Sequence, residues 1–453
     1  MNGRTYRMEH SDEAMSEEMD FFNIPPTVVS CEGREFWSYS SKNPINDNII
    51  LFDIEIPAGF MVETKNITLI MKGKVVLGDG TKIPAMPSTL WNKAAITEAE
   101  KTTLLNSDVY TENLLHSTMF KRVTVRIQDQ TVDSCEYALQ TYIDKMLDFT
   151  PAGTMSMELM RGTRGPTAKK DNASISQTHT EYDSTAWLRS SAIKESKEFE
   201  MRGPVAVDVF KQEKPLMGKT RLVIEMERNS PQKTLCSIKP NADFKLELTQ
   251  CKLEVPVLRL RTDIEEANEL MLQKKPALYP YERTCIKKFY LASGIYSFNA
   301  EDLHHGIIPS QITVFMIPSA NYNGAYNLNF IKMVNNKIST IGIKVDNSPQ
   351  PGAAMSVKYE DQLIGSMLGD PVSAISKTYP QAEWSLNQQY RMPLFVFDLR
   401  NTTSKNLLPL VRKGLSKLEI TFEGPLTENS ILFVSARFPA VMSLDGDRRV
   451  SLQ

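Results

Sequence analysis

The chain lacks the spacing of cysteine and histidine that disulfide frameworks and metal sites require. Its five cysteines are an odd number, scattered singly, and no two form a C-x-x-C pair. They are Cys31, Cys135, Cys236, Cys251 and Cys285. Its five histidines show no metal-ligand spacing either, and the adjacent pair, His304 and His305, would point to opposite sides of an extended strand. The sequence therefore argues against a disulfide framework and a structural zinc site, and we expect no cofactor.

Motifs that mark common enzyme classes are also missing. There is no G-x-S-x-G, no P-loop and no G-x-G-x-x-G. The glycines in 161–170 (RGTRGPTAKK) do not form a phosphate loop, because no strand leads into them and no Lys-Ser/Thr pair follows. We expect no enzyme, although 54 acidic residues leave a glycosidase-type carboxylate pair open.

The chain has little net charge and no long apolar run. A formal charge of −2 argues against a protein whose affinity comes from neutralising phosphates, so we expect no specific nucleic-acid binding. A local basic cluster, Arg161, Arg164, Lys169 and Lys170, is interpreted as a solvated loop, with genome contact as the alternative. We expect no membrane span, because the nearest candidate, 49–62, contains two acidic residues.

The first residues do not resemble a secretion signal. Residues 1–22 carry many acids and no apolar core of signal-peptide length, so a reducing compartment is expected. The three sequons, at Asn66, Asn172 and Asn401, are then interpreted as chance matches.

What the chain does contain is an internal repeat. The pattern of 203–231, GPVAVDVFKQEKPLMGKTRLVIEMERNSP, returns at 392–425 as MPLFVFDLRNTTSKNLLPLVRKGLSKLEITFEGP. Three further pairs keep the same order: 67–71 with 312–316, 123–129 with 341–346, and 244–257 with 431–442. Two similar β units joined in one polypeptide explain this order.

Period-two alternation and β-branched residues predict six strands or more in each unit, which favours sandwiches. The predicted strands of the first unit are 48–56, 67–77, 119–127, 204–210, 220–227 and 244–255. Those of the second unit are 284–291, 311–317, 337–345, 394–399, 415–422 and 431–438. Helical periodicity predicts helices at 135–147 and 359–368, in matching places of the two units, and a linking helix at 263–274.

The second unit resembles a known family. The residues that carry the resemblance are Tyr279, Pro280, Arg283, Gly306, Pro309, Met316, Asn323, Gly324, Tyr326, Asn327 and Phe330. In this order they are similar to the major capsid proteins of Polinton (Maverick) elements and adintovirus-like viruses. The closing segment FVSARFPAVMSLDGDRRVSL is similar to that family's C-terminal strand and tail.

The resemblance implies an all-β double jelly roll, two eight-stranded antiparallel sandwiches side by side, with short helices in loops. It also implies a structural role in the virion: homotrimers that contact neighbouring trimers and a minor or penton capsid protein in an icosahedral shell. The expected division is an arm at 1–33, a first jelly roll at 34–260 with an insertion at 151–201, a linker at 261–280, and a second jelly roll with a tail at 281–453. The compartment of assembly, cytoplasm or nucleus, stays open.

Large apolar side chains outside the repeat are candidates for contacts between subunits. Trp187 lies in the insertion and Trp384 in the corresponding loop of the second unit, and Trp is enriched at interface cores. Phe21 and Phe22 precede two prolines in the N-terminal arm, which could lie across a neighbour. The alternatives are mobile loops and a disordered arm.

Two further interpretations of the whole chain remain open. One is an intracellular β-sandwich binding module, and the other is a domesticated capsid relic that folds without assembling.

Overall fold

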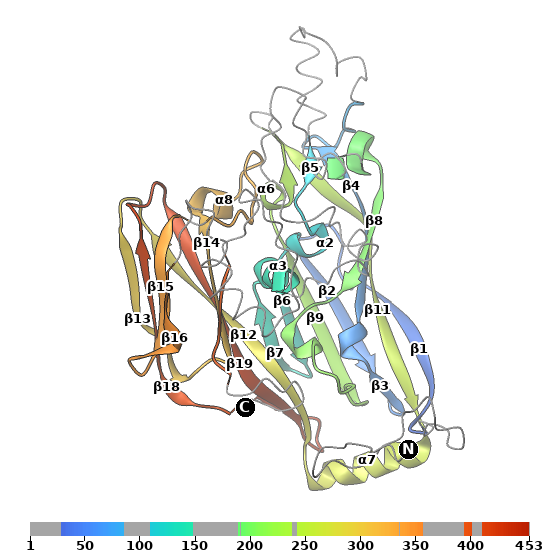
Figure 1. Cartoon of the computed structure of the whole chain (residues 1–453). Helices are drawn as coiled ribbons and strands as arrows, with labels where there is room; N and C mark the ends of the chain where they lie inside the picture. The colour runs from blue at the N-terminus through green and yellow to red at the C-terminus, as the bar shows by residue number, and fades with distance from the viewer. Residues whose placement is uncertain are drawn as a thin grey trace, which may run out of the picture.

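The fold consists of two β sandwiches that lie side by side and are linked by one helix. The computed structural model describes residues 29–85, 109–147, 189–190, 192–237, 242–334, 336–356, 394–400 and 410–452. In Figure 1 the first sandwich (blue to green) stands at the right and the second (yellow to red) at the left. Helix α7 (Thr262–Lys274) runs along the bottom and confirms the predicted linking helix.

The first unit has two facing four-stranded sheets. One has the order β1 (Cys31–Ser40), β11 (Phe244–Leu260), β4 (Thr68–Leu77), β8 (Phe199–Pro204), with the short β3 (Phe60–Val62) also on β11. The other has the order β2 (Ile49–Ile56), β9 (Thr220–Arg228), β6 (Phe120–Ile127), β7 (Gln130–Cys135). All pairings are antiparallel, and alternate side chains from both sheets fill the core between them.

The second unit repeats this order strand for strand. Its sheets are β12 (Ala277–Leu291), β19 (Ser430–Leu444), β14 (Gln311–Pro318), β17 (Phe395–Asp398), and β13 (Ser297–Ile307), β18 (Lys413–Phe422), β15 (Ile338–Val345), β16 (Ser348–Ser356). A short β20 (Val450–Leu452) adds to β19. Numbered along the chain, the eight main strands of either unit form sheets 1-8-3-6 and 2-7-4-5, which is the jelly-roll arrangement.

This topology confirms the internal repeat. Most pairs of similar segments fall on corresponding strands: β4 with β14, β6 with β15, β9 with β18, and β11 with β19. The exception is the pair 203–210 and 392–399, because the second segment contains β17 whereas the first overlaps β8 only at its last two residues. The domain boundaries remain a prediction. The strands nearest to them, β1, β8 and β12, begin at Cys31, Phe199 and Ala277.

One predicted strand is wrong. Residues 204–210 do not form a strand, because β8 ends at Pro204 and a 3-10 turn, η5 (Asp208–Phe210), follows. The apolar residues of this segment alternate because their side chains are buried although the backbone is not paired in a sheet. Side chains bind its backbone there: the Ala206 amide donates to the Tyr137 hydroxyl, and the Val209 amide donates to Asp133.

Helix α3 (Tyr137–Leu147) confirms the helix predicted at 135–147. It lies in the connection from β7 to β8, between the two sandwiches (Figure 1). The corresponding prediction at 359–368 lies outside the described residues. Other short elements are β5 (Tyr110–Thr111), paired with β10 (Leu235–Cys236), and helices α2 (Leu115–Thr118), α6 (Pro231–Thr234) and α8 (Ser319–Asn323).

Candidate functional site: the junction between the two units

Helix α3 fills the space between the sandwiches with apolar side chains. Its buried face consists of Ala138, Leu139, Tyr142 and Ile143. This face packs on the outer side of the second unit's β12-β19-β14-β17 sheet. The sheet contributes Phe315, Ile317, Val396, Ile431 and Phe433. Both faces of that sheet are therefore buried, one against its own sandwich and one against the first unit.

Aromatic rings and two lysines extend the junction toward α8. Phe315 and Phe433 stack with centroids 5.0 Å apart, and Tyr322 of α8 packs on Phe433 at 5.2 Å. Lys233 of the first unit lies 4.7 Å from the Tyr322 ring centroid, a cation–π contact across the junction. Lys288 of β12 pairs with Glu136, which immediately precedes α3, at 2.5 Å. The second unit is thus held to the first by charge as well as by apolar contact.

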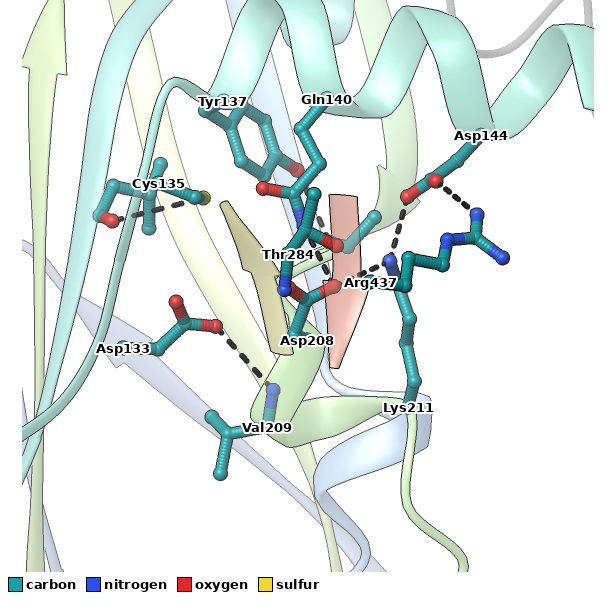
Figure 2. A network of polar contacts seen from close by, with 12 residues as sticks. Asp133, Cys135, Tyr137, Gln140, Asp144, Asp208, Val209, Lys211, Thr284 and Arg437 are labelled. Carbon is teal, nitrogen blue, oxygen red and sulfur yellow. Dashed lines mark hydrogen bonds and ion pairs between the residues drawn. The ribbon is translucent and has the colours of Figure 1, made fainter. Parts of the chain in front are cut away.

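A buried polar network crosses the junction below α3, and Figure 2 shows its members converging from both units. The carboxylate of Asp208 accepts hydrogen bonds from the Thr284 amide of β12 at 2.6 Å, from Gln140 of α3 at 2.6 Å, and from Lys211 Nζ at 2.8 Å. Asp144 of α3 accepts from Lys211 at 2.6 Å and from Arg437 of β19 at 2.7 Å. Each carboxylate therefore joins groups from both sandwiches.

The charges of this network compensate one another. Burial alone would raise the pKa of Asp144, but Lys211 and Arg437 outweigh it and hold that pKa below its ordinary value. Burial would lower the pKa of Lys211, but Asp144 and Asp208 raise it instead. The ion pairs thus favour the charged forms in spite of burial.

Asp133 is the uncompensated member of the cluster. Burial, with a contribution from the charge of Asp208, raises the pKa of Asp133 to about 6, and the amide of Val209 only partly offsets this. Its carboxylate accepts a hydrogen bond from that amide at 3.3 Å. The ionised form of Asp133 is therefore unfavourable in the folded chain.

A pocket of about 410 Å³ opens beside this network. Acidic and basic groups both line it: Asp144, Asp208, Glu213 and Glu282 against Lys211, Lys214 and Arg437. Lys211 and Arg437 already bind the carboxylates of the network, so the arrangement can fasten the two units together. Among the described residues, no group of three or more His, Cys, Asp or Glu side chains could hold a metal ion.

The predicted contact residues are not placed by the structure. Phe21, Phe22, Trp187 and Trp384 lie outside the described residues, as do Arg161, Arg164, Lys169 and Lys170. Of the histidines, His116 is buried with Nε2 3.2 Å from the Leu69 carbonyl oxygen, and His304 packs edge-on against Phe438. In the described part of the chain, no helix is long and apolar enough to cross a membrane.

Sequence reasoning did not identify the junction network. Asp144 and Arg437 are 293 positions apart, and nothing local marks either of them. One available signal was Asp208, a single acid inside the apolar stretch VAVDVF. A buried carboxylate there requires hydrogen-bond partners, and the Thr284 amide of the second unit is one of them.

Comparisons with known proteins give matches by structure only. No family model and no curated protein sequence matches the chain. A chain of the Sputnik virophage superposes with a TM-score of 0.65 at 13% identity, over 99% of this chain and 94% of that one. The fold is that of a double jelly-roll capsid protein. A chain of the PBCV-1 virus capsid gives a TM-score of 0.55 at 10% identity over 95% and 99% of the two chains. The Faustovirus major capsid protein gives 0.54 at 9% identity over 93% and 92%.

Proposed function

We propose that this chain is the major capsid protein of a virus or virus-like element, and that three copies form a pseudo-hexameric ring that tiles an icosahedral shell. The observation that carries the proposal is the repetition of one jelly roll, in the same strand order, in two units fastened side by side. Three such chains would present six similar walls to their neighbours. The capsid chains with this fold support the same role.

We further infer that the chain acts in the virion, through contacts with its own copies and with a minor capsid protein at the shell vertices. The Polinton, Maverick or adintovirus-like assignment rests on the residue pattern of the second unit. Several of those residues have structural roles in this chain. Tyr326 is largely buried and its hydroxyl donates to the Phe244 carbonyl of the first unit, while Gly306 and Gly324 have φ of +97° and +92°.

Electron microscopy of the purified full-length chain, imaged over a range of concentrations and salt, tests this function. Three-lobed or hexagonal particles, or closed shells, are expected. Uniform single-chain particles under all conditions would contradict the proposal and favour a β-sandwich binding module or a domesticated relic.

A further inference from the structure

The contact between the two units joins unlike surfaces. The first unit contributes the side that carries the β7-to-β8 connection, with α3 and η5, and the second contributes the outer face of its β12-β19-β14-β17 sheet. A contact of this head-to-tail kind uses a different surface on each unit, so each unit keeps one of the two surfaces free. If the same contact forms between copies through these free surfaces, the copies can close a ring. The free counterpart on the first unit is the outer face of the β1-β11-β4-β8 sheet.

We propose that this outer face binds the second unit of another copy of the same chain, and that the contact is ionic. The charged face is defined here by Ile70, Lys72, Glu200, Arg202, Lys252 and Glu254. The inference rests on the proposed ring of three chains and adds the surface used and its chemistry.

The strand registers identify the corresponding positions of the two sheets. In the second unit Phe315 of β14 lies opposite Phe433 of β19, and in the first unit Ile70 of β4 lies opposite Lys252 of β11. One step along, Thr313 lies between Ser435 and Val396, and its counterpart Thr68 lies between Glu254 and Pro204.

The same comparison reaches the remaining charged positions. Ile317 pairs with Ile431, whereas its counterpart Lys72 pairs with Gln250 and Glu200. Arg202 takes the place of Leu394, which packs against α3. Of six apolar positions covered in the second unit, three are thus charged and one is a glutamine on the first unit, where the described part of the chain leaves the face uncovered.

The charged side chains form ion pairs across the strands while remaining open to solvent. Arg202 pairs with Glu254, and these side chains are 47% and 28% exposed. Lys72 pairs with Glu200 at 3.1 Å, and Lys252 lies beside Ile70. Pairs this exposed stabilise a single chain by less than about 1 kcal/mol, so they leave charge available to a partner.

The difference in chemistry fits the two situations. The face inside the chain never separates from α3, so an apolar contact carries no risk of aggregation. The face between copies is open to water until assembly, and a large apolar patch there would promote nonspecific association. Charged side chains keep the free chain soluble and orient the partner as it approaches.

The charge reversal Glu254→Arg tests the face directly. It would reverse one charge of the face and remove the partner of Arg202, and we expect ring formation by the full-length chain to weaken by about tenfold or more, because reversing a charge breaks the complementarity of an ionic contact. The matched control is Glu225→Arg on the outer face of the other sheet. Glu225 pairs with Arg126, and the side chains of Glu225 and Arg126 are 30% and 42% exposed.

Light scattering after size exclusion, with circular dichroism to check folding, distinguishes the outcomes. The inference is supported if wild type and Glu225→Arg form trimers whereas Glu254→Arg is folded but monomeric. Trimers of all three proteins would overturn the charged face and leave the proposed function intact, whereas a monomeric wild type would contradict the ring itself.

Salt provides a second measurement that needs no variant. Raising sodium chloride from 0.05 to 1 M shortens the screening length from above 10 Å to about 3 Å. We expect the wild-type trimer to be less stable in high salt, so that it dissociates at a higher protein concentration than in low salt. A trimer that is equally stable, or more stable, at 1 M would overturn the ionic character of the contact.

Discussion

At the residue scale, Asp133 is a buried carboxylate whose charged form the fold disfavours. Burial raises the pKa of Asp133 most, and the charge of the Asp208 carboxylate raises it further, whereas the charge of Lys211 lowers it. Cys135 and Tyr281 lie near enough for their own pKa values to be raised by burial and by the charge of Asp133. The folded chain therefore binds a proton here at pH values where the unfolded chain has released it.

This proton sets a pH dependence of stability. An unfolded aspartate ionises near pH 3.9, and folded Asp133 ionises at about 6. Its protonated form supports the fold fully below about pH 4, and this stability is lost as pH rises to about 6, by up to about 3 kcal/mol.

We predict that Asp133→Asn removes this loss. Relative to wild type, the variant gains stability as pH rises from 4 to 7, measured as the free energy of unfolding in denaturant at each pH. A constant difference between variant and wild type across this range would contradict the assignment.

Lys211 is expected to be the most costly cation to remove from the junction. In Lys211→Met, Asp208 loses its cation and Asp144 retains only Arg437, so we predict a loss of about 2 kcal/mol in unfolding free energy. The loss stays below that of a fully buried pair, because the Lys211 side chain is 40% exposed. Lys65→Met, which removes an exposed pair with Glu213, is the control, and equal effects would contradict the network's role.

At the element scale, strands with one buried face were predictable from sequence. β4, β9, β15 and β18 alternate buried and exposed side chains, and their predicted bounds lie within a few residues of the observed ones. The β4/β14 and β6/β15 matches succeeded because corresponding strands face similar cores.

Strands at the sheet edges were missed for physical reasons. β1 exposes most of its side chains, so its sequence CEGREFWSYS carries no apolar alternation. β13 has an irregular register between Ala300 and His304, which interrupts the period of two. These strands form because they pair with an adjacent strand, and the local sequence does not reveal which strand that is.

Helix α3 carries the apolar contact between the units, and Leu139 lies on its buried face. We predict that Leu139→Ala lowers the unfolding free energy by about 2–5 kcal/mol, because it leaves a cavity where α3 meets the second sheet. Leu270→Ala on α7 is the control: Leu270 is 59% exposed, so a change within about 0.5 kcal/mol is expected. Similar losses from both variants would contradict the role of α3.

At the scale of the whole molecule, the sequence predicted the two-unit architecture better than the contacts between the units. The repeat and the resemblance led to the double jelly roll, whereas the junction depends on residues that only the folded topology brings together. Asp144 meets Arg437, and Asp208 meets Thr284, across two separate sandwiches. The candidate contacts at Phe21, Phe22, Trp187 and Trp384 remain predictions.

The mass of the purified full-length protein in solution tests the central claim most directly. Light scattering after size exclusion, near neutral pH and at low salt, is predicted to give a particle close to three times 51.2 kDa, or larger assemblies built from that unit. A monomer that persists at high concentration would contradict the account.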